Sequence, residues 1–480
     1  MNYRGEFTMS LEKNENAELK ANYLSFVEII AQSIGSIAPT ASLAFVIPLV
    51  YATAGNGTWL VYLFALIATL LVTFNLNKFT SRSASPGSLY TYIVLGLGPS
   101  IGFISGWALL LGYGLTASAV LSGFISFSNE VLGYIDVHIP LVILGIVGAI
   151  STWYVAYRDI KLSAKLTLLF EGLSVGIISI LGLIVLIHNG FTVDWAQFTL
   201  EEVSPNSIRT GLVIAFFSFV GFESAASLGA EAKEPLKIIP KTLIVSTILV
   251  GIFFVAFSYI EIIGYLGSTT KLNEAAAPLS TLAQLHSVGF LAPVLAIGTV
   301  FSFWASVLAC TNAGARILLT MGRHDILQSA LGNIHKKNQT PHVSILTFVV
   351  IFSIIPVILI GLDFGIADIY GWLGTLATFG LIFNYLLITI ATPVYLKKNN
   401  LLQKRDTALA AITAIILLIP LVGSVYPIQD YPYNLFPLLF IAWLFVGIVW
   451  FQFKKGRHPE LVGNINGEID KISEKFREAM

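Results

Sequence analysis

The sequence predicts an all-α integral membrane protein with twelve transmembrane helices. Hydrophobic residues make up 56% of the 480 residues, charged residues only 11%, and the mean hydropathy is +0.81. Soluble domains carry about 25% charged residues. The apolar residues gather in runs long enough to cross a bilayer, which takes about 20 helical residues. The basic residues fall on alternate sides of these runs, and this pattern sets the number of spans.

Twelve apolar runs are expected to span the membrane. The third and the eighth are too long for one perpendicular crossing, so we expect them to be tilted or to extend past the bilayer. The runs cover residues 26–50, 58–77, 89–127, 137–157, 163–188, 208–230, 242–266, 288–320, 343–361, 365–393, 407–425 and 434–453.

The distribution of Lys and Arg follows the positive-inside rule. With both termini in the cytoplasm, only Arg209 and Lys271 of the 27 basic residues fall in outer segments. A soluble helical protein does not explain this alternation. The sequence therefore predicts a multi-pass protein of the plasma membrane, embedded in the lipid bilayer. Residues 1–23 and 454–480 are expected to be short, solvated cytoplasmic tails.

Composition and motifs exclude several other classes of protein. The net charge is zero, so no nucleic-acid partner is expected. The single cysteine, Cys310, excludes an internal disulfide and a cysteine-based metal cluster. No histidine pair has metal-ligand spacing, no phosphate-binding glycine-rich loop occurs, and no nucleophile set stands out. We therefore expect no enzyme, no catalytic residue, no metal and no cofactor. A channel is disfavoured because no filter motif is repeated.

Two of the spans are expected to be interrupted. The first carries Gly35 and Pro39, and proline removes a backbone donor and clashes with the preceding turn. The sixth is expected to break over residues 218–223, which include Gly221. Unwound backbone is tolerated within a membrane only where it is buried in protein or lines a cavity. Broken helices in matching positions of two repeats mark the substrate site of many transporters.

Three carboxylates lie within predicted spans. Glu223 is in the middle of the sixth span, where a charged side chain costs roughly 2.5–3.5 kcal/mol on insertion scales. Glu171 lies about a third of the way into the fifth span, and Glu261 lies toward the outer end of the seventh. Intramembrane carboxylates commonly relay protons. We expect Glu223 and Glu171 to couple protons, and Glu261 to lie at the membrane interface.

Several motifs resemble those of the amino acid–polyamine–organocation (APC) superfamily of permeases. Residues 217–224 read Phe-Ser-Phe-Val-Gly-Phe-Glu-Ser, and residues 231–240 read Glu-Ala-Lys-Glu-Pro-Leu-Lys-Ile-Ile-Pro. The first is similar to the family's aromatic-rich break, and the second to its lead into the seventh span. Further similarities lie at residues 85–92, 163–165, 315–323 and 340–341. The resemblance runs in order through spans one to ten.

This resemblance implies the five-plus-five inverted repeat of LeuT-like transporters. The repeats would be residues 24–193 and 194–396, with spans eleven and twelve added over 397–453. Phe217 takes the place of an aromatic gate over the substrate, and Trp304 is a candidate lining residue. The substrate carboxylate would meet the backbone N–H groups of Ser33, Ile34, Gly35, Ser36 and Ile37. The substrate amino group would meet the backbone carbonyls of Phe217, Ser218, Phe219 and Val220.

The coupling ion has two candidate sites. Sodium-coupled relatives bind the cation between carbonyls of span one and a hydroxyl pair on span eight. Ser302 and Ser306 are spaced i, i+4, and so share one helix face. Some proton-coupled relatives instead place a lysine within span five, where this chain has Lys165 at the very start and Glu171 inside. Neither pattern transfers fully, and we favour protons over sodium.

The sequence thus predicts a secondary active permease that imports a small-molecule substrate. We expect a neutral amino acid, carried by proton symport and alternating access. The alternatives are a polyamine or organic amine permease, an amino acid exchanger and a sodium-coupled symporter. Outside transport, the same site would serve a membrane sensor of amino acids. The absence of an acidic cluster disfavours polyamines.

Overall fold

The computed structural model describes residues 18–426 and 430–477 of the chain. Residues 1–17 and 478–480 of the expected tails lie outside the described residues. Within the described ranges the chain is helical, and it forms no strand beyond one isolated parallel bridge between Leu24 and Ala232. This confirms the predicted all-α class.

The helices vary widely in length, from single turns to segments longer than a bilayer is thick. The α-helices are α1 Phe26–Ile37, α2 Pro39–Ala41, α3 Ile47–Ala54, α4 Thr58–Thr80, α5 Leu89–Leu97, α6 Pro99–Gly133, α7 Leu141–Arg158, α8 Ile160–His188, α9 Trp195–Phe198, α10 Pro205–Phe219, α11 Pro235–Gly264, α12 Pro278–Leu285, α13 Ala292–Arg323, α14 His342–Gly361, α15 Ile366–Lys398, α16 Lys404–Gly423, α17 Phe436–Arg457 and α18 Leu461–Arg477. The shorter elements are the π-helix η1 Ser42–Val46 and the 3-10 helices η2 Gly55–Gly57, η3 Phe222–Leu228, η4 Leu272–Glu274, η5 Gly289–Leu291, η6 Ser329–Gly332 and η7 Tyr433–Leu435.

Eleven helical stretches among the described residues are long and apolar enough to cross a membrane. The first of them, Phe26–Thr80, covers 55 residues and therefore contains two of the expected spans, 26–50 and 58–77. The short helix η2 separates these two parts. The other ten stretches lie at the other ten predicted positions.

The third predicted span is divided into two helices. Helix α5 ends at Leu97, Gly98 adopts φ 89°, and α6 begins at Pro99. Proline is well suited to the first position of a helix, since its missing N–H has no partner there in any case. The expected run of 89–127 is thus a short helix followed by a 35-residue helix.

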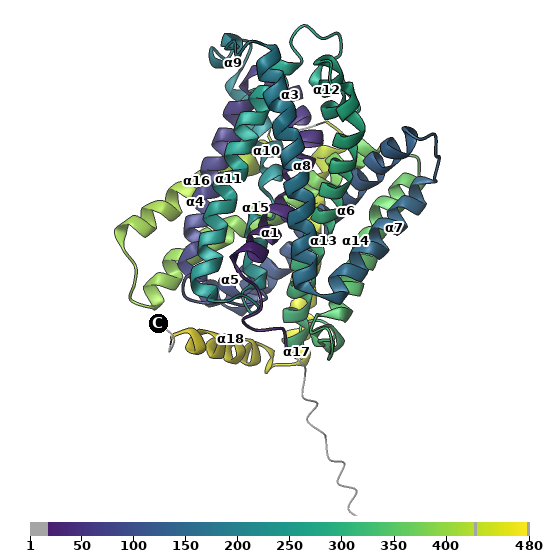
Figure 1. Ribbon diagram of the computed structural model, residues 1–480. Helices are drawn as coiled ribbons and strands as arrows, with labels where there is room; N and C mark the ends of the chain where they lie inside the picture. The colour runs from purple at the N-terminus through teal and green to yellow at the C-terminus, as the bar shows by residue number, and fades with distance from the viewer. Residues whose placement is uncertain (1–17, 427–429, 478–480) are drawn as a thin grey trace, which may run out of the picture.

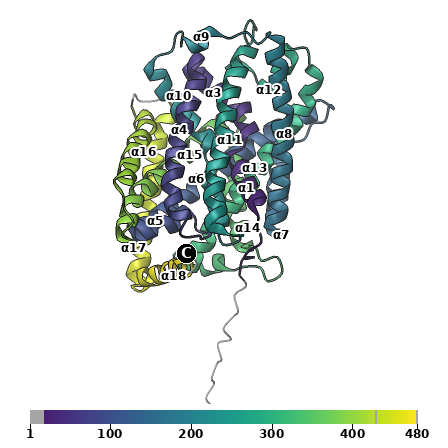
Figure 2. The same ribbon diagram turned by 60° about the vertical axis from the view of Figure 1, so that its left-hand side comes forward.

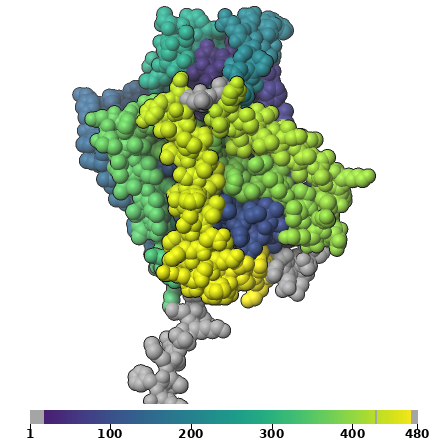
Figure 3. Space-filling model, turned by 180° about the vertical axis from the view of Figure 1, so that it is seen from behind, coloured from purple at the N-terminus to yellow at the C-terminus, as the bar shows by residue number. Residues whose placement is uncertain are grey.

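The long helices run side by side, with α6 inside the bundle and α16 and α17 outside (Figures 1 and 2). The most apolar stretch of α6 is 94% buried, whereas that of α17 is only 22% buried. Figure 3 shows α17 running along one face of the molecule. Its exposed Leu438, Ile441 and Phe445 form an apolar surface of the kind that faces lipid.

Small residues let the inner helices approach closely. A Cβ atom on Gly380 of α15 would lie 2.6 Å from the carbonyl oxygen of Ala108 on α6, so only glycine fits there. Without a hydrophobic effect between helices in lipid, close backbone approach is a main source of packing energy. This contact holds α6 and α15 together beside the site described below.

Polar side chains fix where several helices begin. Asp159 Oδ1 accepts hydrogen bonds from the backbone N–H groups of Lys161 and Leu162, at 2.8 and 3.0 Å, and starts α8. Ser204 Oγ accepts from Ser207 N at 3.0 Å and starts α10. Such caps satisfy donors that the first turn of a helix leaves free.

The expectation of a solvated C-terminal tail was wrong for most of its length. Residues 461–477 form α18, which lies across the end of the bundle away from α9 (Figures 1 and 2). Leu461, Ile465 and Ile469 are buried, which gives α18 one apolar face against the protein. Their spacing of four residues is the helical period, so the signal was present in the sequence.

Candidate functional site

The first interruption follows α1 and lies one residue beyond the stretch that the sequence indicated. Helix α1 continues through Ile37, and Ala38 then adopts φ 51° and ψ 71°, which ends it. Pro39 begins α2, and the π-helix η1 and α3 carry the chain onward. Residues 33–37 are thus the last turn of a helix rather than unwound backbone.

The second interruption follows α10. This helix ends at Phe219, Val220 is extended with ψ 134°, and Gly221 adopts φ 92°. Seven residues of 3-10 helix, η3, come next. The positive φ favours glycine, because other residues pay a steric penalty in that region.

The two interruptions lie against each other. Ser33 Oγ donates a hydrogen bond to the carbonyl oxygen of Phe222 at 2.7 Å, and Ser224 Oγ donates to that of Gln32 at 3.3 Å. A Cβ atom on Gly221 would lie only 2.5 Å from Ser36 Oγ. Segments about 190 residues apart in the chain therefore form one buried centre.

Backbone groups of opposite kind lie at the two interruptions. Thr40 and Ala41 are in the first turn of the helix that begins at Pro39, where N–H groups have no partner within the helix, and the buried Thr40 Oγ1 has no hydrogen-bond partner among the described residues. Ser218 and Phe219 are in the last turn of α10, where carbonyl groups have no partner within the helix. The start of one helix thus offers donors and the end of another offers acceptors.

This arrangement changes the expected role of residues 33–37. Backbone N–H groups inside a helix bond to the carbonyl four residues earlier, so those of Ser33 to Ile37 are used within α1. The first N–H groups after the interruption that lack a partner within their own helix are those of Thr40 and Ala41, because Pro39 has no N–H and Ala38 N bonds to Ile34 O at 2.9 Å. Ser33 and Ser36 instead join the two interruptions through their side chains.

Glu223 is fully buried beside the second interruption, with a donor on each carboxyl oxygen. Tyr113 on α6 donates to Oε1 and Tyr385 on α15 donates to Oε2, both at 2.7 Å. Hydrogen bonds to a carboxylate are roughly twice as strong as neutral ones. Glu223 therefore links η3 to two helices that frame the site.

The other predicted coupling residues form two separate contacts. Ser302 Oγ on α13 donates to Glu171 Oε1 at 2.7 Å, and Glu171 Oε2 has no partner among the described residues. Ser306 Oγ lies 3.5 Å from the carbonyl oxygen of Ser36. The two serines thus share a helix face, but Ser302 contacts α8 and Ser306 contacts α1.

A cluster of aromatic rings covers the interruptions on the side away from α18. Phe45 stacks on Tyr370 with ring centroids 4.7 Å apart, and Phe217 meets Tyr370 edge-on at 5.7 Å. Phe127 and Phe303 pack against Phe45 at 5.6 and 5.8 Å. Phe217 also packs on α15, since a Cβ atom on Gly374 would lie 2.6 Å from its ring.

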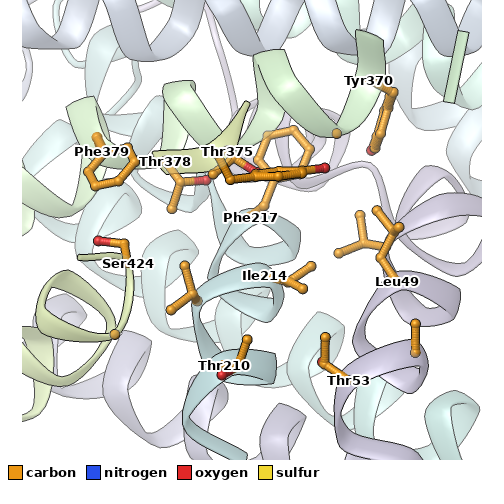
Figure 4. Close-up of a pocket in the computed structure, with 16 residues that line it drawn as sticks. Leu49, Thr53, Thr210, Ile214, Phe217, Tyr370, Thr375, Thr378, Phe379 and Ser424 are labelled. Carbon is orange, nitrogen blue, oxygen red and sulfur yellow. The ribbon is translucent and has the colours of Figure 1, made fainter. Parts of the chain in front are cut away.

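A cavity of about 270 Å³ lies beyond this cluster, between α3, α10, α15 and α16. Figure 4 shows Phe217 and Tyr370 on its wall with Thr210, Ile214 and Leu49 from α10 and α3. No charged side chain is among the residues that line it. Of the predicted site residues, only Phe217 reaches this cavity.

Trp304 does not lie in the site. Its indole Nε1 donates to Ser151 Oγ on α7 at 2.8 Å, and its ring meets Phe170 edge-on. It belongs to a small apolar cluster between α7, α13 and α14. Its helix was correctly expected near the site, but the sequence did not tell which face of that helix the indole occupies.

The opposite end of the site, toward α18, is closed by ion pairs that the sequence analysis did not assign. Arg316 donates from Nε and Nη2 to the two oxygens of Glu231, at 2.7 and 3.0 Å, and both side chains are buried. Glu231 O in turn accepts from the backbone N–H groups of Tyr23 and Leu24. Glu231 and Arg316 both lie within the motifs that resemble the family, at residues 231–240 and 315–323, and this was the only feature of the sequence that pointed to them.

A second pair at this end joins the segment before α1 to the start of α8. Lys20 Nζ donates to Asp159 Oδ2 at 2.5 Å. Burial alone would raise the pKa of Asp159, but the bonds from Lys20 and from the Leu162 and Lys161 N–H groups hold it below its usual value. Burial lowers the pKa of Lys20, but its bond to Asp159 outweighs this and raises it.

Glu261, which was expected at the membrane interface, lies inside the protein near the end of α11. The side chain is completely buried, and neither carboxyl oxygen has a hydrogen-bond partner among the described residues. Loops and short helices beyond the end of α11 cover this region, which hydropathy alone does not reveal.

Comparisons with known proteins identify a matching family and several relatives. Residues 24–460 match the model of the family described as "Amino acid permease". The branched-chain amino acid permease BcaP of Bacillus subtilis is 25% identical over 439 residues, which is 85% of this chain and 88% of the relative. The methylthioribose transporter of the same organism is 24% identical over 69% of this chain and 74% of its own length. The low-affinity putrescine importer PlaP of Escherichia coli is 26% identical over 59% and 64%.

Proposed function

The chain belongs to the amino acid permease family of the APC superfamily, and on that premise we propose that it imports neutral amino acids by proton symport. The family and its relatives are permeases rather than enzymes, and the relatives are named for branched-chain amino acids, putrescine and methylthioribose. We further propose twelve spans in the plasma membrane, with two inverted repeats of five and both termini in the cytoplasm. The distribution of basic residues supports this orientation.

The observation that carries the proposal is the pair of interrupted helices in contact. The first-turn N–H groups of Thr40 and Ala41 would bind the carboxylate of the substrate, with Thr40 Oγ1 as a further donor. The last-turn carbonyls of Ser218 and Phe219 would bind its ammonium group. A helix start favours negative charge and a helix end favours positive charge, so this pair of sites suits a zwitterion.

The surroundings favour an apolar side chain on the substrate. The aromatic cluster above the interruptions offers ring faces and no charge, and the cavity beyond it has no charged lining residue. A second amino group of a polyamine would find no counter-charge on these walls. The branched-chain permease relative supports the same choice, and the putrescine importer supports the amine alternative.

Glu223 is the proposed proton-coupling residue, with Glu171 as a second. Glu223 adjoins the α10 interruption and bonds to α6 and α15, so a change in its charge would act on three parts of the site. Sodium coupling through Ser302 and Ser306 receives less support, because their oxygens make separate contacts.

The two ends of the site are closed by different kinds of contact, which supports the proposal of alternating access. The pairs Arg316–Glu231 and Lys20–Asp159 close the end near α18, whereas the cavity beside Phe217 lies toward the other end. With α18 in the cytoplasm, this conformation is sealed from the inside. Import would require both pairs to separate after the substrate binds.

The test is uptake by the purified protein in proteoliposomes, under imposed proton or sodium gradients. The panel holds labelled neutral, acidic and basic amino acids and putrescine. We expect neutral amino acids to accumulate when the proton gradient points inward. Accumulation driven by sodium alone would overturn proton coupling, and accumulation of putrescine alone would overturn the substrate class. A protein that binds amino acids but moves no solute is a sensor.

A matched variant tests the role of Glu223. Glu223→Gln keeps the shape of the side chain but removes its titratable group. We expect it to bind the substrate and to lose the pH dependence of uptake. Unchanged pH dependence would remove Glu223 from the coupling role.

A further inference from the structure

An amphipathic helix lies across the end of the bundle that the two ion pairs close (Figures 1 and 2). This helix, α18, follows α17 along the chain and packs against α5, α6 and α17. Its buried Leu461, Ile465 and Ile469 follow the helical period and form its apolar face. The substrate site described above does not use this helix, although α18 lies over its closed end.

A cavity of about 390 Å³ lies between α18 and the Arg316–Glu231 pair. Ala232 and Thr320 line it on the side of the pair, because Ala232 follows Glu231 and Thr320 Oγ1 donates to the carbonyl oxygen of Arg316 at 2.8 Å. Glu468 of α18 lines the same cavity. A substrate that passes the separated ion pair would therefore enter this cavity, and α18 borders it.

One polar contact joins α18 to the end of α13. Glu468 Oε2 lies 3.2 Å from Nε2 of the buried His324, and Tyr90 OH on α5 lies 2.5 Å from the other ring nitrogen, Nδ1. Burial would raise the pKa of Glu468, but the contact with His324 and the charges of Arg323 and Lys471 hold it below its usual value. Glu468 is therefore an anion that ties α18 to the helix that also carries the cation of the buried pair.

We propose that α18 is an autoinhibitory strap that closes the cytoplasmic exit of the substrate site. Its apolar face and the contact between Glu468 and His324 hold it over the cavity. When the Arg316–Glu231 pair separates, the substrate enters the cavity, and α18 has to lift before the substrate leaves. This proposal rests on the proposed transport function, because an exit is needed only where a substrate passes through.

The single cysteine of the chain supplies a probe of this exit. Cys310 is fully buried, and its sulfur lies 3.8 Å from Ser36 Oγ at the end of α1. The probe reagent is a membrane-impermeant maleimide, added to inside-out membrane vesicles that contain the full chain. From that side it reaches Cys310 only when the ion pair has separated and α18 has lifted. The rate of labelling therefore measures how often the exit is open.

Two variants loosen the strap in different ways. Ile465→Glu places a charge in the apolar face, and should raise the labelling rate about tenfold or more, because the burial of one large aliphatic side chain contributes at least that factor. Glu468→Gln keeps the shape of its side chain, and should raise the rate about two- to fivefold, because a partly exposed pair is weak. Wild-type rates in both variants would overturn the proposal. A rate raised by Ile465→Glu alone would overturn the role of the contact between Glu468 and His324.

The matched control lies on the same helix. A Cβ atom on Gly467 would meet no atom within 4 Å, so Gly467→Ala leaves the packing of α18 unchanged and should label at the wild-type rate. An increase in Gly467→Ala equal to that of Ile465→Glu would show that the labelling does not report on the apolar face, and would overturn the assignment. Thermal unfolding of each variant separates a loosened strap from a general loss of structure.

Transport measurements separate this proposal from the proposed function. In proteoliposomes, both loosening variants should speed counterflow of the substrate and leave its accumulation ratio at a fixed pH gradient unchanged, because a strap alters rates and not the number of coupled protons. Slower counterflow without faster labelling would show that α18 only supports the fold, and would overturn the strap. Absence of counterflow in the wild type would instead overturn the transport function, and the labelling rates would still report on α18.

Discussion

Replacing Gly221 with alanine would place a methyl group between the two interrupted helices. The new Cβ atom would lie 2.5 Å from Ser36 Oγ and 2.8 Å from Ser36 Cβ, closer than such atoms approach in folded proteins. Gly221 also has φ 92°, where a residue with a side chain is strained. The substitution therefore opposes both the local backbone and the contact between α1 and η3.

The magnitude follows from these two effects. Left-handed backbone costs roughly 1–2 kcal/mol for a residue with a Cβ atom. Overpacking a tight contact typically adds about 1–3 kcal/mol. The conformation with the two interruptions in contact should therefore be destabilised by about 2–5 kcal/mol. A free-energy difference of about 1.4 kcal/mol corresponds to a tenfold change in affinity. If the substrate binds this conformation, Gly221→Ala should weaken binding at least about tenfold.

The assay is substrate binding to purified protein, with thermal unfolding measured on the same samples. Adding Ser36→Gly to Gly221→Ala removes the Ser36 side chain from the contact, and should restore part of the lost affinity. Gly133→Ala is the control, because a Cβ atom there would meet no atom within 4 Å. Unchanged affinity and stability in Gly221→Ala would refute the argument that the two interruptions form one centre.

Three further predictions concern the closed end of the site and Trp304. Glu231→Gln should lose about 3–5 kcal/mol of stability in thermal unfolding, because it leaves Arg316 buried without a counter-charge. Replacing both residues with methionine should recover most of this loss. A Glu231→Gln variant as stable as the wild type would contradict the prediction. The Lys20–Asp159 pair should contribute about 1 kcal/mol, because both side chains are partly exposed. The lowered pKa of Asp159 and the raised pKa of Lys20 mean that this contribution is lost only below about pH 4 and above about pH 10. Thermal unfolding of the wild type and Lys20→Met across pH measures it, and a difference that already disappears at pH 6 would contradict the pairing. Trp304→Phe should leave substrate affinity within about twofold of the wild type, because the indole bonds to Ser151 on α7 and not to the site. The lost hydrogen bond should cost only about 1 kcal/mol of stability. A tenfold loss of affinity would place the indole at the substrate.

Hydropathy and charge were enough to predict most of the architecture. Apolar runs of bilayer length set the positions of the helices, because a spanning segment must satisfy its backbone internally. The division at Gly98 was missed, since glycine and proline are both frequent within membrane helices and so do not mark an end there. Helix α18 was missed because its buried residues are few and stand mostly among glycines and asparagines, which are poor helix formers.

The two interruptions lie within a turn of helix of the predicted positions. Gly35, Pro39 and Gly221 are conformational signals that a sequence displays, and both interruptions lie at or next to them. Which backbone groups lack a partner within a helix depends on where each helix ends. Because α1 continues to Ile37, the candidate donors are the N–H groups of Thr40 and Ala41 and not those of residues 33–37.

Side-chain partners were the least predictable part. Tyr113 and Tyr385 reach Glu223 from positions 110 and 162 residues away, and no local pattern marks them. The same limit applies to the complete burial of Glu261, which tertiary packing decides. The charge of an intramembrane carboxylate is visible in a sequence, whereas its partners are visible only in the fold.

The position of a bound amino acid tests the central claim most directly. A structure of the protein with a neutral amino acid should place the carboxylate within hydrogen-bonding distance of the Thr40 and Ala41 N–H groups. The same structure should place the ammonium group at the carbonyls of Ser218 and Phe219. A ligand found only in the cavity beyond Phe217, with both interruptions unoccupied, would contradict the account.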